Sequence, residues 1–208
     1  MIANDDRRAI SQVPSKLGRA AAQTLYRDVF DTLVDNDTCT YDSVALFHSS
    51  HANTDTSAGL AQSTLTTGRR KMIEQAAYGD SSEILALTPK YLIVPPELEE
   101  TGFVLAGSRA VPASNTVGAS DQPNIHAGIE PILVPYLTDA NDWFLVADPD
   151  SVPTLEVGFY NGRQEPELFT QSDNSVGSVF NSDTFTWKIR FIYLVMILDH
   201  RGFYRGQG

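Results

Sequence analysis

Apolar residues recur at every fourth position between Leu17 and Val34, a spacing typical of an amphipathic helix. The stripe consists of Leu17, Ala21, Leu25, Val29 and Leu33, and is widened by Ala22, Tyr26, Phe30 and Val34. Pro14 and Ser15 stand just before it, and Ser15 is a typical N-cap. The pattern predicts a helix over residues 15–35, which at about 1.5 Å per residue is some five turns long.

A second helix is predicted at Thr64–Tyr78, with Gly79 as its stop signal. Its expected inner face consists of Leu65, Met72, Ile73 and Ala76. The preceding segment, Asn36–Ser63, is rich in Ser, Thr, Asp and Asn and indicates a long loop with a short apolar island at Val44–Phe47. A loop of this length often contacts a partner.

Short apolar runs flanked by turn residues predict strands rather than helices in the middle of the chain. Lys90–Val94 is one such run, closed by two prolines and followed by a possible helix at Glu97–Ala106. Ile132–Leu137 and Trp143–Ala147 are two more, separated by a polar turn at Thr138–Asp142. Residues 107–126, rich in Ser, Pro, Asn and Gly, are expected to form a loop.

The last third of the sequence alternates between apolar and polar residues, as strands do. Leu155–Tyr160 and Glu165–Phe169 flank an Asn-Gly pair and are predicted to form a hairpin. Thr184–Asp199 is predicted to form one long strand. One face of it carries Phe185, Trp187, Ile189, Phe191, Tyr193, Val195 and Ile197. The other face turns apolar from Ile192 onward, so we expect the C-terminal half of this strand to be covered on both faces.

Composition narrows the class of protein. With 42% apolar residues in 208, the chain can bury a substantial core in one or two domains. Its formal net charge of −11 opposes binding to nucleic acid phosphates or to an anionic membrane surface. The single cysteine rules out an internal disulfide and suits a reduced cytosol. Met1–Arg8 does not resemble a signal peptide, and the longest apolar run, Phe191–Leu198, is too short to span a membrane.

Candidate metal sites are weak. His48 and His51 are three residues apart, with Asp55 nearby, and could chelate zinc. The loop lacks a full ligand set, and two surface histidines that stabilise a turn explain the spacing better. Asp139, Asn141 and Asp142 are similar to a calcium loop, but Trp143 and Phe144 stand where such a loop needs an oxygen ligand and a glycine. Turn formation is the simpler interpretation.

Nucleophile and phosphate motifs are also missing. There is no Gly-x-Ser-x-Gly and no glycine-rich phosphate loop, and Cys39 is interpreted as a loop residue rather than a nucleophile. The basic clusters Arg7–Arg8 and Arg69–Lys71 lack interleaved aromatic residues, so we interpret them as exposed ends or subunit contacts. The basic segment His200–Arg205 is interpreted as a docking element for an acidic neighbour. We expect no catalytic, cofactor-binding or metal residues, and no enzyme.

Several segments together resemble the major head subunits of Mu-type phages. They are Asn4–Asp6 before Leu17–Ala21, Ala45–Asn53, Leu92–Leu98, Trp143–Pro149, and Trp187–Arg190 with Asp199–Phe203. The resemblance runs through the whole chain in the same order. It is to the capsid proteins of tailed phages, some of them fused to a head maturation protease.

The resemblance implies an α+β fold of the Hong Kong 97 type, with a long spine helix, long antiparallel strands and an inserted α/β axial domain. Residues 15–35 would be the spine and 184–199 the long strand. The peripheral-type domain would comprise 1–89 and 154–208, and the axial-type domain 90–153. Family members carry an N-terminal arm and an extended loop before the spine, so we expect this chain to be an N-terminally truncated form.

The function implied is a structural subunit of a phage or prophage head that self-associates into an icosahedral shell. The shell would enclose DNA without sequence-specific binding and without a membrane partner, although this truncated form could be monomeric. It would be made in the bacterial cytoplasm and reside in the virion. The surfaces of interest would be the loop tips at His48–Asn53 and residues 107–124. The alternatives are another phage structural module, such as a tail or scaffold component, and a hydrolase using the His48/His51 loop.

Overall fold

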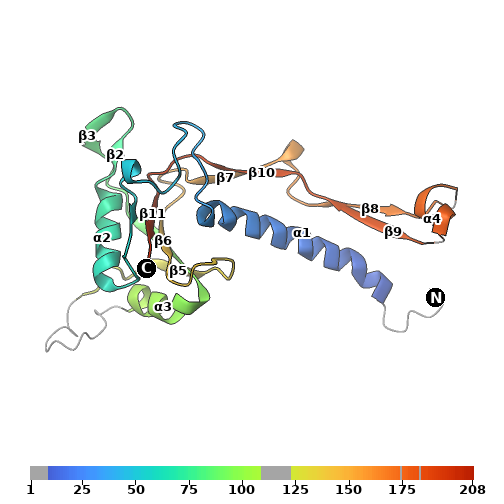
Figure 1. Cartoon of the computed structure of the whole chain (residues 1–208), viewed down its shortest axis with the longest axis horizontal. Coiled ribbons are helices and arrows are strands. Elements are labelled where there is room, and N and C mark those ends of the chain that lie inside the picture. Colours follow the sequence, from blue (N-terminus) through green and yellow to red (C-terminus); the bar gives the residue numbers. More distant parts are fainter. Residues whose placement is uncertain (1–8, 109–122, 174, 183) are drawn as a thin grey trace. The chain divides into compact units, whose positions relative to one another are not determined.

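The computed structural model describes residues 9–108, 123–173, 175–182 and 184–208, and is shown in Figure 1. The chain divides into two compact units. The first, called the helix–strand unit here, comprises Met1–Val29 and Val157–Val195. The second, called the sheet unit, comprises Phe30–Glu156 and Met196–Gly208. Each is described by itself.

The sheet unit is built on five strands in the order β1-β11-β6-β4-β5. Their bounds are Thr54–Asp55 for β1, Phe203–Gly206 for β11, Trp143–Ala147 for β6, Pro89–Val94 for β4 and Glu130–Leu133 for β5. β6 runs antiparallel to both its neighbours, whereas the outer pairs β1–β11 and β4–β5 are parallel. The two predicted strands around the Thr138–Asp142 turn are therefore present, but they are not neighbours, because β4 lies between them.

Each face of this sheet is covered by a separate core. On one face, Phe144 and Val146 of β6 pack with Leu33, Leu46 and Phe47, which come from the chain before the sheet. On the other face, the side chains from the sheet include Leu145, and those from the covering helices include Leu65, Met72 and Leu105. We call these the loop-side core and the helix-side core. The predicted strand Ile132–Leu137 is shorter than expected because its last residues leave the sheet, and Val134 and Leu137 fill the loop-side core instead.

Helices α2 (Gln62–Ile73) and α3 (Glu99–Gly107) cover the helix-side core (Figure 1). The predicted helix Thr64–Tyr78 ends earlier than expected, because Ala76–Ala77 form β2, which pairs with β3 (Asp80–Ile84). Leu65 and Met72 are buried as expected, but Ile73 is only half-buried. The 3-10 turn η2 (Pro96–Leu98) separates β4 from α3, so the helix predicted after the two prolines is confirmed with a later start.

The long predicted helix is present as α1 (Ala9–Val34), and it begins before the expected start at residue 15. Pro14 and Ser15 lie inside the helix rather than at its cap. The fixed φ of proline fits a helix, so its cost here is one missing backbone donor and crowding of the preceding turn. In its last turn, Leu33 is fully buried in the loop-side core.

The strands between Leu155 and Ile197 form antiparallel pairs that correct two predictions. The bounds are Leu155–Phe159 for β7, Glu167–Gln171 for β8, Thr186–Arg190 for β9 and Tyr193–Ile197 for β10. β7 pairs with β10 and β8 pairs with β9, so the predicted hairpin of β7 with β8 was wrong. The short turn η4 (Tyr160–Gly162) redirects the chain with positive φ at Asn161 and Gly162, as the Asn-Gly signal indicates. It links two strands that each find a partner in the late segment.

The predicted single strand Thr184–Asp199 is two strands for the same reason. At Phe191–Ile192 the late segment changes partner from β8 to β7, and the Ile192 carbonyl accepts a bond of 3.2 Å from the Tyr160 amide. The predicted apolar face is confirmed within β9 and β10, where the odd-numbered residues are half-buried or buried and the even-numbered ones are exposed. Phe185, the first residue of that face, lies before β9 and is exposed. The tip beyond β8 carries the short helix α4 (Gly177–Ser182).

The predicted loop Asn36–Ser63 has little regular structure beyond η1 (Ser49–His51) and β1, and its island Val44–Phe47 is anchored by Leu46 and Phe47 in the loop-side core. Most of the loop predicted at residues 107–126 falls outside the described residues. At its end, Asn124 is 7% exposed, and its amide donates to the carbonyls of Leu105 and Ser108 at 2.7 and 2.8 Å. This side chain closes the last turn of α3 rather than forming a surface tip.

Gly68 of α2 sits where the helix packs on the sheet. A methyl group there would lie 2.6 Å from a ring carbon of Tyr204, a fully buried side chain whose hydroxyl donates to Asp55 at 2.8 Å. We expect Gly68→Ala to lower the free energy of unfolding by about 1–3 kcal/mol in urea denaturation, because the ring cannot move aside. Gly18→Ala in α1 is the control. It meets nothing within 4 Å, and should raise stability by about 0.5–1 kcal/mol. Equal effects at the two sites would contradict this packing.

Candidate functional site

The histidine loop does not assemble the expected zinc ligands. His48 caps η1, because its Nδ1 atom accepts a hydrogen bond from the Ser50 backbone amide at 3.2 Å. The same atom lies 2.7 Å from the Ser50 hydroxyl. Asp55 is engaged elsewhere, because it accepts from Lys71 Nζ at 2.6 Å and from the Tyr204 hydroxyl at 2.8 Å. His48 therefore stabilises a turn, as the sequence indicates. His51 does not fit the interpretation as a surface residue, because it is only 6% exposed.

The structure joins His51 to two residues that sequence reasoning did not connect with it. Its Nε2 atom lies 2.8 Å from the Asp42 carboxylate, and its ring stacks on that of His200 with centroids 3.7 Å apart. One ligand atom from each of these three residues lies within 4.8 Å of the others. Because His200 is 149 positions from His51, no local spacing could have revealed the cluster.

The Asp139–Asp142 turn serves the fold. Asp139 accepts the Asn141 amide at 2.9 Å, the turn geometry predicted from the sequence. Asp142 is 4% exposed and accepts two bonds from the Arg205 guanidinium, at 2.9 and 2.5 Å. Its carboxylate is thus already matched by a cation of the same chain, an arrangement that explains the acidic residue without calcium.

The basic C-terminal segment lies inside the molecule. Phe203 and Tyr204 are 1% and 0% exposed, Arg205 pairs with Asp142, and Arg201 pairs with Asp199 at 2.9 Å. The expected docking of His200–Arg205 on an acidic neighbour is therefore wrong for these side chains. The segment becomes β11, and burial of a strand requires that its charges be paired within the chain.

Cys39 is a core residue rather than a loop bystander. It is fully buried in the loop-side core, where it also holds a tight turn by accepting the Ser43 amide and donating to the Val44 carbonyl. Burial raises the pKa of its thiol, which favours the protonated form. A buried neutral thiol is a poor nucleophile.

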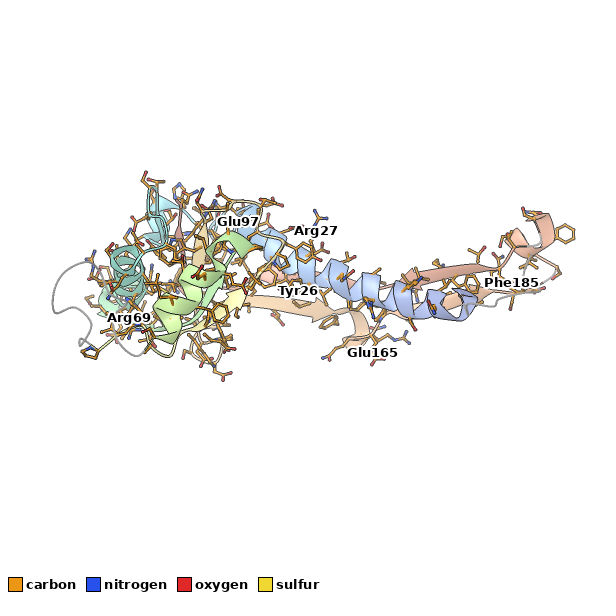
Figure 2. The ribbon with its side chains drawn as sticks, turned by 90° about the horizontal axis from the view of Figure 1, so that it is seen from below. Tyr26, Arg27, Arg69, Glu97, Glu165 and Phe185 are labelled. Carbon is orange, nitrogen blue, oxygen red and sulfur yellow. The ribbon has the colours of Figure 1, made fainter. Side chains whose placement is uncertain are left out.

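The basic cluster Arg69–Lys71 lies on α2, where Figure 2 labels Arg69. Lys71 is bound to Asp55, and Arg70 lies 3.6 Å from Glu74. The other predicted basic cluster, Arg7–Arg8, lies outside the described residues. In the helix–strand unit, a pocket of about 420 Å³ contains two arginines, Arg163 and Arg190, but both contact the carboxylate of Glu167. Neither surface therefore concentrates unpaired positive charge.

Exposed apolar side chains are the most distinctive surface feature. Among the residues that the structure describes, more than half of the exposed large apolar side chains lie between Tyr160 and Leu198. Four of them follow the outward face of β10 and its ends: Ile192, Leu194, Met196 and Leu198, at 47, 61, 37 and 36% exposure. We call this row the β10 stripe. The sequence predicted that this face would be covered, but no other part of the described chain buries it.

Phe180 of α4 and Phe185, just before β9, are also exposed, at 70 and 45%. Figure 2 labels Phe185. β9, by contrast, exposes Thr186, Lys188 and Arg190 on the equivalent positions. The apolar character is therefore concentrated at certain places on the surface. No helix in the described part of the chain is long and apolar enough to cross a membrane. Concentrated apolar surface of this kind marks contacts with other macromolecules.

A family model described as phage capsid protein matches residues 1–206. The chain belongs to this family. Curated protein sequences gave no match. Among solved structures, the holo-SrpI encapsulin complex from Synechococcus elongatus PCC 7942, determined by cryo-EM, is similar with a TM-score of 0.53 at 9% identity.

The likeness to the encapsulin covers 94% of this chain and 65% of that one, so this capsid-family chain spans less than two thirds of the length of the structure it matches. At such low identity the likeness concerns the fold. The chain has the α+β capsid fold of the Hong Kong 97 type, as the sequence resemblance implied. Family and fold indicate a structural rather than a catalytic protein.

The Asp142–Arg205 pair gives a test of its structural role. We expect Asp142→Ala to lower the free energy of unfolding by about 3–5 kcal/mol, because it leaves a buried guanidinium unpaired. Asp139→Ala, in the exposed part of the same turn, should cost less than about 1 kcal/mol. Thermal denaturation with and without calcium checks both points. A calcium-dependent rise in melting temperature that Asp142→Ala abolishes would instead support the calcium site.

Proposed function

We propose that this chain is a structural subunit of a phage or prophage head, of the Mu type, that self-associates into an icosahedral shell around DNA. Membership of the phage capsid family and the capsid fold support the proposal. The residue motifs from Asn4 to Phe203 support the Mu-type assignment. On this view the protein is made in the bacterial cytoplasm and resides in the virion, and its function depends on surfaces rather than on an active site.

The observation that carries self-association is the β10 stripe. If another surface covered these four aliphatic side chains fully, the burial of their apolar area, at about 25 cal/mol per Å², would contribute several kcal/mol to the free energy of association. A monomer gains nothing from exposing them. We assign their cover to another copy of this chain, because a capsid subunit is surrounded by copies of itself. A contact between unlike surfaces of identical subunits can continue around a closed assembly.

The charge of the chain agrees with a container for DNA. A net charge of −11 opposes adhesion to phosphate, and Lys71, Arg190 and Arg205 are each paired with a carboxylate of the same chain. Enclosure without sequence-specific binding is therefore the mode we propose.

We keep the domain assignment that the resemblance implies. Residues 1–89 and 154–208 form the peripheral-type domain, with α1 as the spine, and residues 90–153 the axial-type domain. In this chain the strands β4, β5 and β6 of the axial-type segment share a sheet with β1 and β11.

The hydrolase alternative has one specific contact in its favour, the Ser50 hydroxyl beside His48 Nδ1. A catalytic base of this type needs an acid that orients it. The nearby carboxylate of Asp42 contacts His51 rather than His48. The pair is therefore better explained as the cap of η1, and a tail or scaffold role remains the main alternative within the phage structural proteins.

Self-association can be tested on the β10 stripe. We expect the double substitution Leu194→Asp and Met196→Asp to raise the concentration needed for assembly at least tenfold, because each lost apolar contact is worth about 1–2 kcal/mol and tenfold corresponds to about 1.4 kcal/mol. The unfolding midpoint should change little, because both side chains are already exposed. Sedimentation velocity and electron microscopy provide the measurement.

The matched control is Thr186→Asp with Lys188→Asp, two exposed positions on β9, the other strand of the same late segment. It introduces acids on a face that is already polar and should leave assembly unchanged. Equal loss of assembly in both variants would point to charge alone and contradict the contact proposed for the stripe. Unchanged assembly in the Leu194/Met196 variant would also contradict it.

A further inference from the structure

His51 has an acceptor at each of its two ring nitrogens. Nδ1 lies 3.0 Å from the Leu46 carbonyl oxygen, which can only accept. Nε2 lies 2.8 Å from the Asp42 carboxylate. A neutral ring has one bare nitrogen, and either tautomer turns that lone pair toward an oxygen acceptor, which repels it. A proton on both nitrogens, or a metal ion at Nε2, satisfies both acceptors.

The geometry of the rings favours the proton. A zinc ion binds an imidazole nitrogen along its lone pair, in the plane of the ring, at about 2.0–2.1 Å. The rings of His51 and His200 are stacked with an interplanar angle of 5° and centroids 3.7 Å apart. Two nearly parallel planes offer no nearby point that lies in both, so one ion cannot be bound by both rings as they stand. The proton needs no such rearrangement, and it makes His51 an imidazolium that donates to Leu46 and to Asp42.

Asp42 is suited to be the negative partner. Burial works against its ionised form, but hydrogen bonds from the Val44 amide and from His51 outweigh this and lower the pKa of the carboxyl. The carboxyl of Asp42 therefore favours its ionised form, which suits it to accept a hydrogen bond from His51. The amide of Gln75 donates to the His51 carbonyl at 2.9 Å and fixes the same residue from the α2 side.

His200 is held in the opposite protonation state. Burial, with the charge of His51 beside it, lowers the pKa of His200 to about 4, so the ring is neutral at neutral pH. The Tyr41 hydroxyl lies at its Nδ1 and also accepts the His200 amide at 3.2 Å. Burial raises the pKa of Tyr41, so the phenol keeps the proton that it donates to the ring.

The other charged and titratable groups around the cluster are His48, Asp199, Arg201, Arg70, Lys71 and Glu74, together with Tyr78 and with Cys39, whose side chain is hydrogen-bonded to Tyr41. Three of the cations are paired, Arg201 with Asp199, Arg70 with Glu74 and Lys71 with Asp55. The His48 ring lies 6.4 Å from that of His51, edge to face. None of these pairs replaces Asp42 as the partner of His51.

The cluster joins two distant segments. It lies between the loop Tyr41–Asn53 and the turn that leads from Leu198 into β11. Asn53 reinforces the contact. Its side-chain amide donates to the Leu46 carbonyl at 2.8 Å, and its backbone carbonyl accepts the Arg205 amide at 2.9 Å.

We propose that Asp42, His51 and His200 form a proton-operated joint, in which a charged His51 stacked on a neutral His200 holds the start of β11 to the loop, and in which protonation of His200 in acid opens it. A second imidazolium 3.7 Å from the first would repel it, and the new proton on Nδ1 would compete with the Tyr41 hydroxyl. The inference concerns the folded sheet unit and holds whether or not the shell proposed above forms.

The sign of the pH effect follows from the proton balance. An unfolded His200 takes up its proton near pH 6.5, whereas the folded one does so only near pH 4. Between these values the unfolded state binds more protons at this site, so the contribution of His200 to stability is fully present above about pH 6.5 and falls as the pH is lowered toward 4. Below pH 4, protonation of Asp42 removes the partner of His51 and lowers stability further.

The first test is the protonation state of His51 at pH 7, read from the ring nitrogen chemical shifts of the full chain labelled at histidine. We expect both nitrogens of His51 to carry protons and one nitrogen of His200 to be bare. A single protonated nitrogen on His51 would overturn the proposal. Stoichiometric zinc binding that shifts the rings of both His51 and His200 would overturn it in favour of a metal site.

The second test is the pH dependence of unfolding for the wild type, His200→Phe and His48→Gln. Phe keeps an aromatic ring on His51 but cannot take up a proton. We expect the wild type and His48→Gln to take up about one additional proton on unfolding between pH 6.5 and 4, and His200→Phe to lack that uptake. Equal pH slopes in all three proteins would refute the role of His200.

Hydrogen exchange locates the opening without relying on global stability. We expect the amides of Ala58, Arg205 and Gln207, which bond across the β1–β11 contact, to lose protection at pH 4 before the amides of β4 and β6 do. His200→Phe should retain that protection. Uniform loss of protection over the whole sheet unit would mean that acid unfolds it globally, which contradicts a local joint.

Discussion

The structure depends on the burial of β6 on both faces. All five residues of this strand are buried, with Phe144 and Val146 in the loop-side core and Trp143, Leu145 and Ala147 in the helix-side core. Such a strand must be flanked by other strands, because its backbone groups cannot reach water. It must also be covered by two layers. The presence of α2 and α3 on one side, and of the end of α1 with the Asn36–Phe47 segment on the other, follows from that requirement.

The two units differ in how completely they bury their own apolar side chains. The sheet unit closes both of its cores and pairs its buried charges, including Asp142 with Arg205. In the other unit the strands come in pairs, and a strand pair has one face against other elements and one face in solvent. Ile192 and Leu194, which belong to this unit, form the first half of the β10 stripe on that solvent face. The sheet unit thus contains closed cores and buried ion pairs, whereas the helix–strand unit leaves a row of apolar side chains exposed.

The sequence predicted elements well where periodicity is strong and failed where partners decide the outcome. The four-residue repeat from Leu17 to Val34 predicted α1, and the apolar runs predicted β4 and β6. The pairing of β7 with β10 could not be predicted, because an Asn-Gly pair indicates the local turn geometry and does not determine which strand then pairs with β7. The stack of His51 on His200 could not be predicted either, because it results from the position of β11 in the sheet.

The position of β11 has a consequence for synthesis on the ribosome. It follows every other strand in the sequence, yet it lies inside the sheet, between β1 and β6. Until residues 203–206 emerge, β6 has an open edge and Trp143 lacks the packing of Tyr204. The sheet unit therefore cannot close until these four residues have left the ribosome. Before that point the nascent chain exposes an incomplete core, and this is the interval in which it is most prone to aggregate.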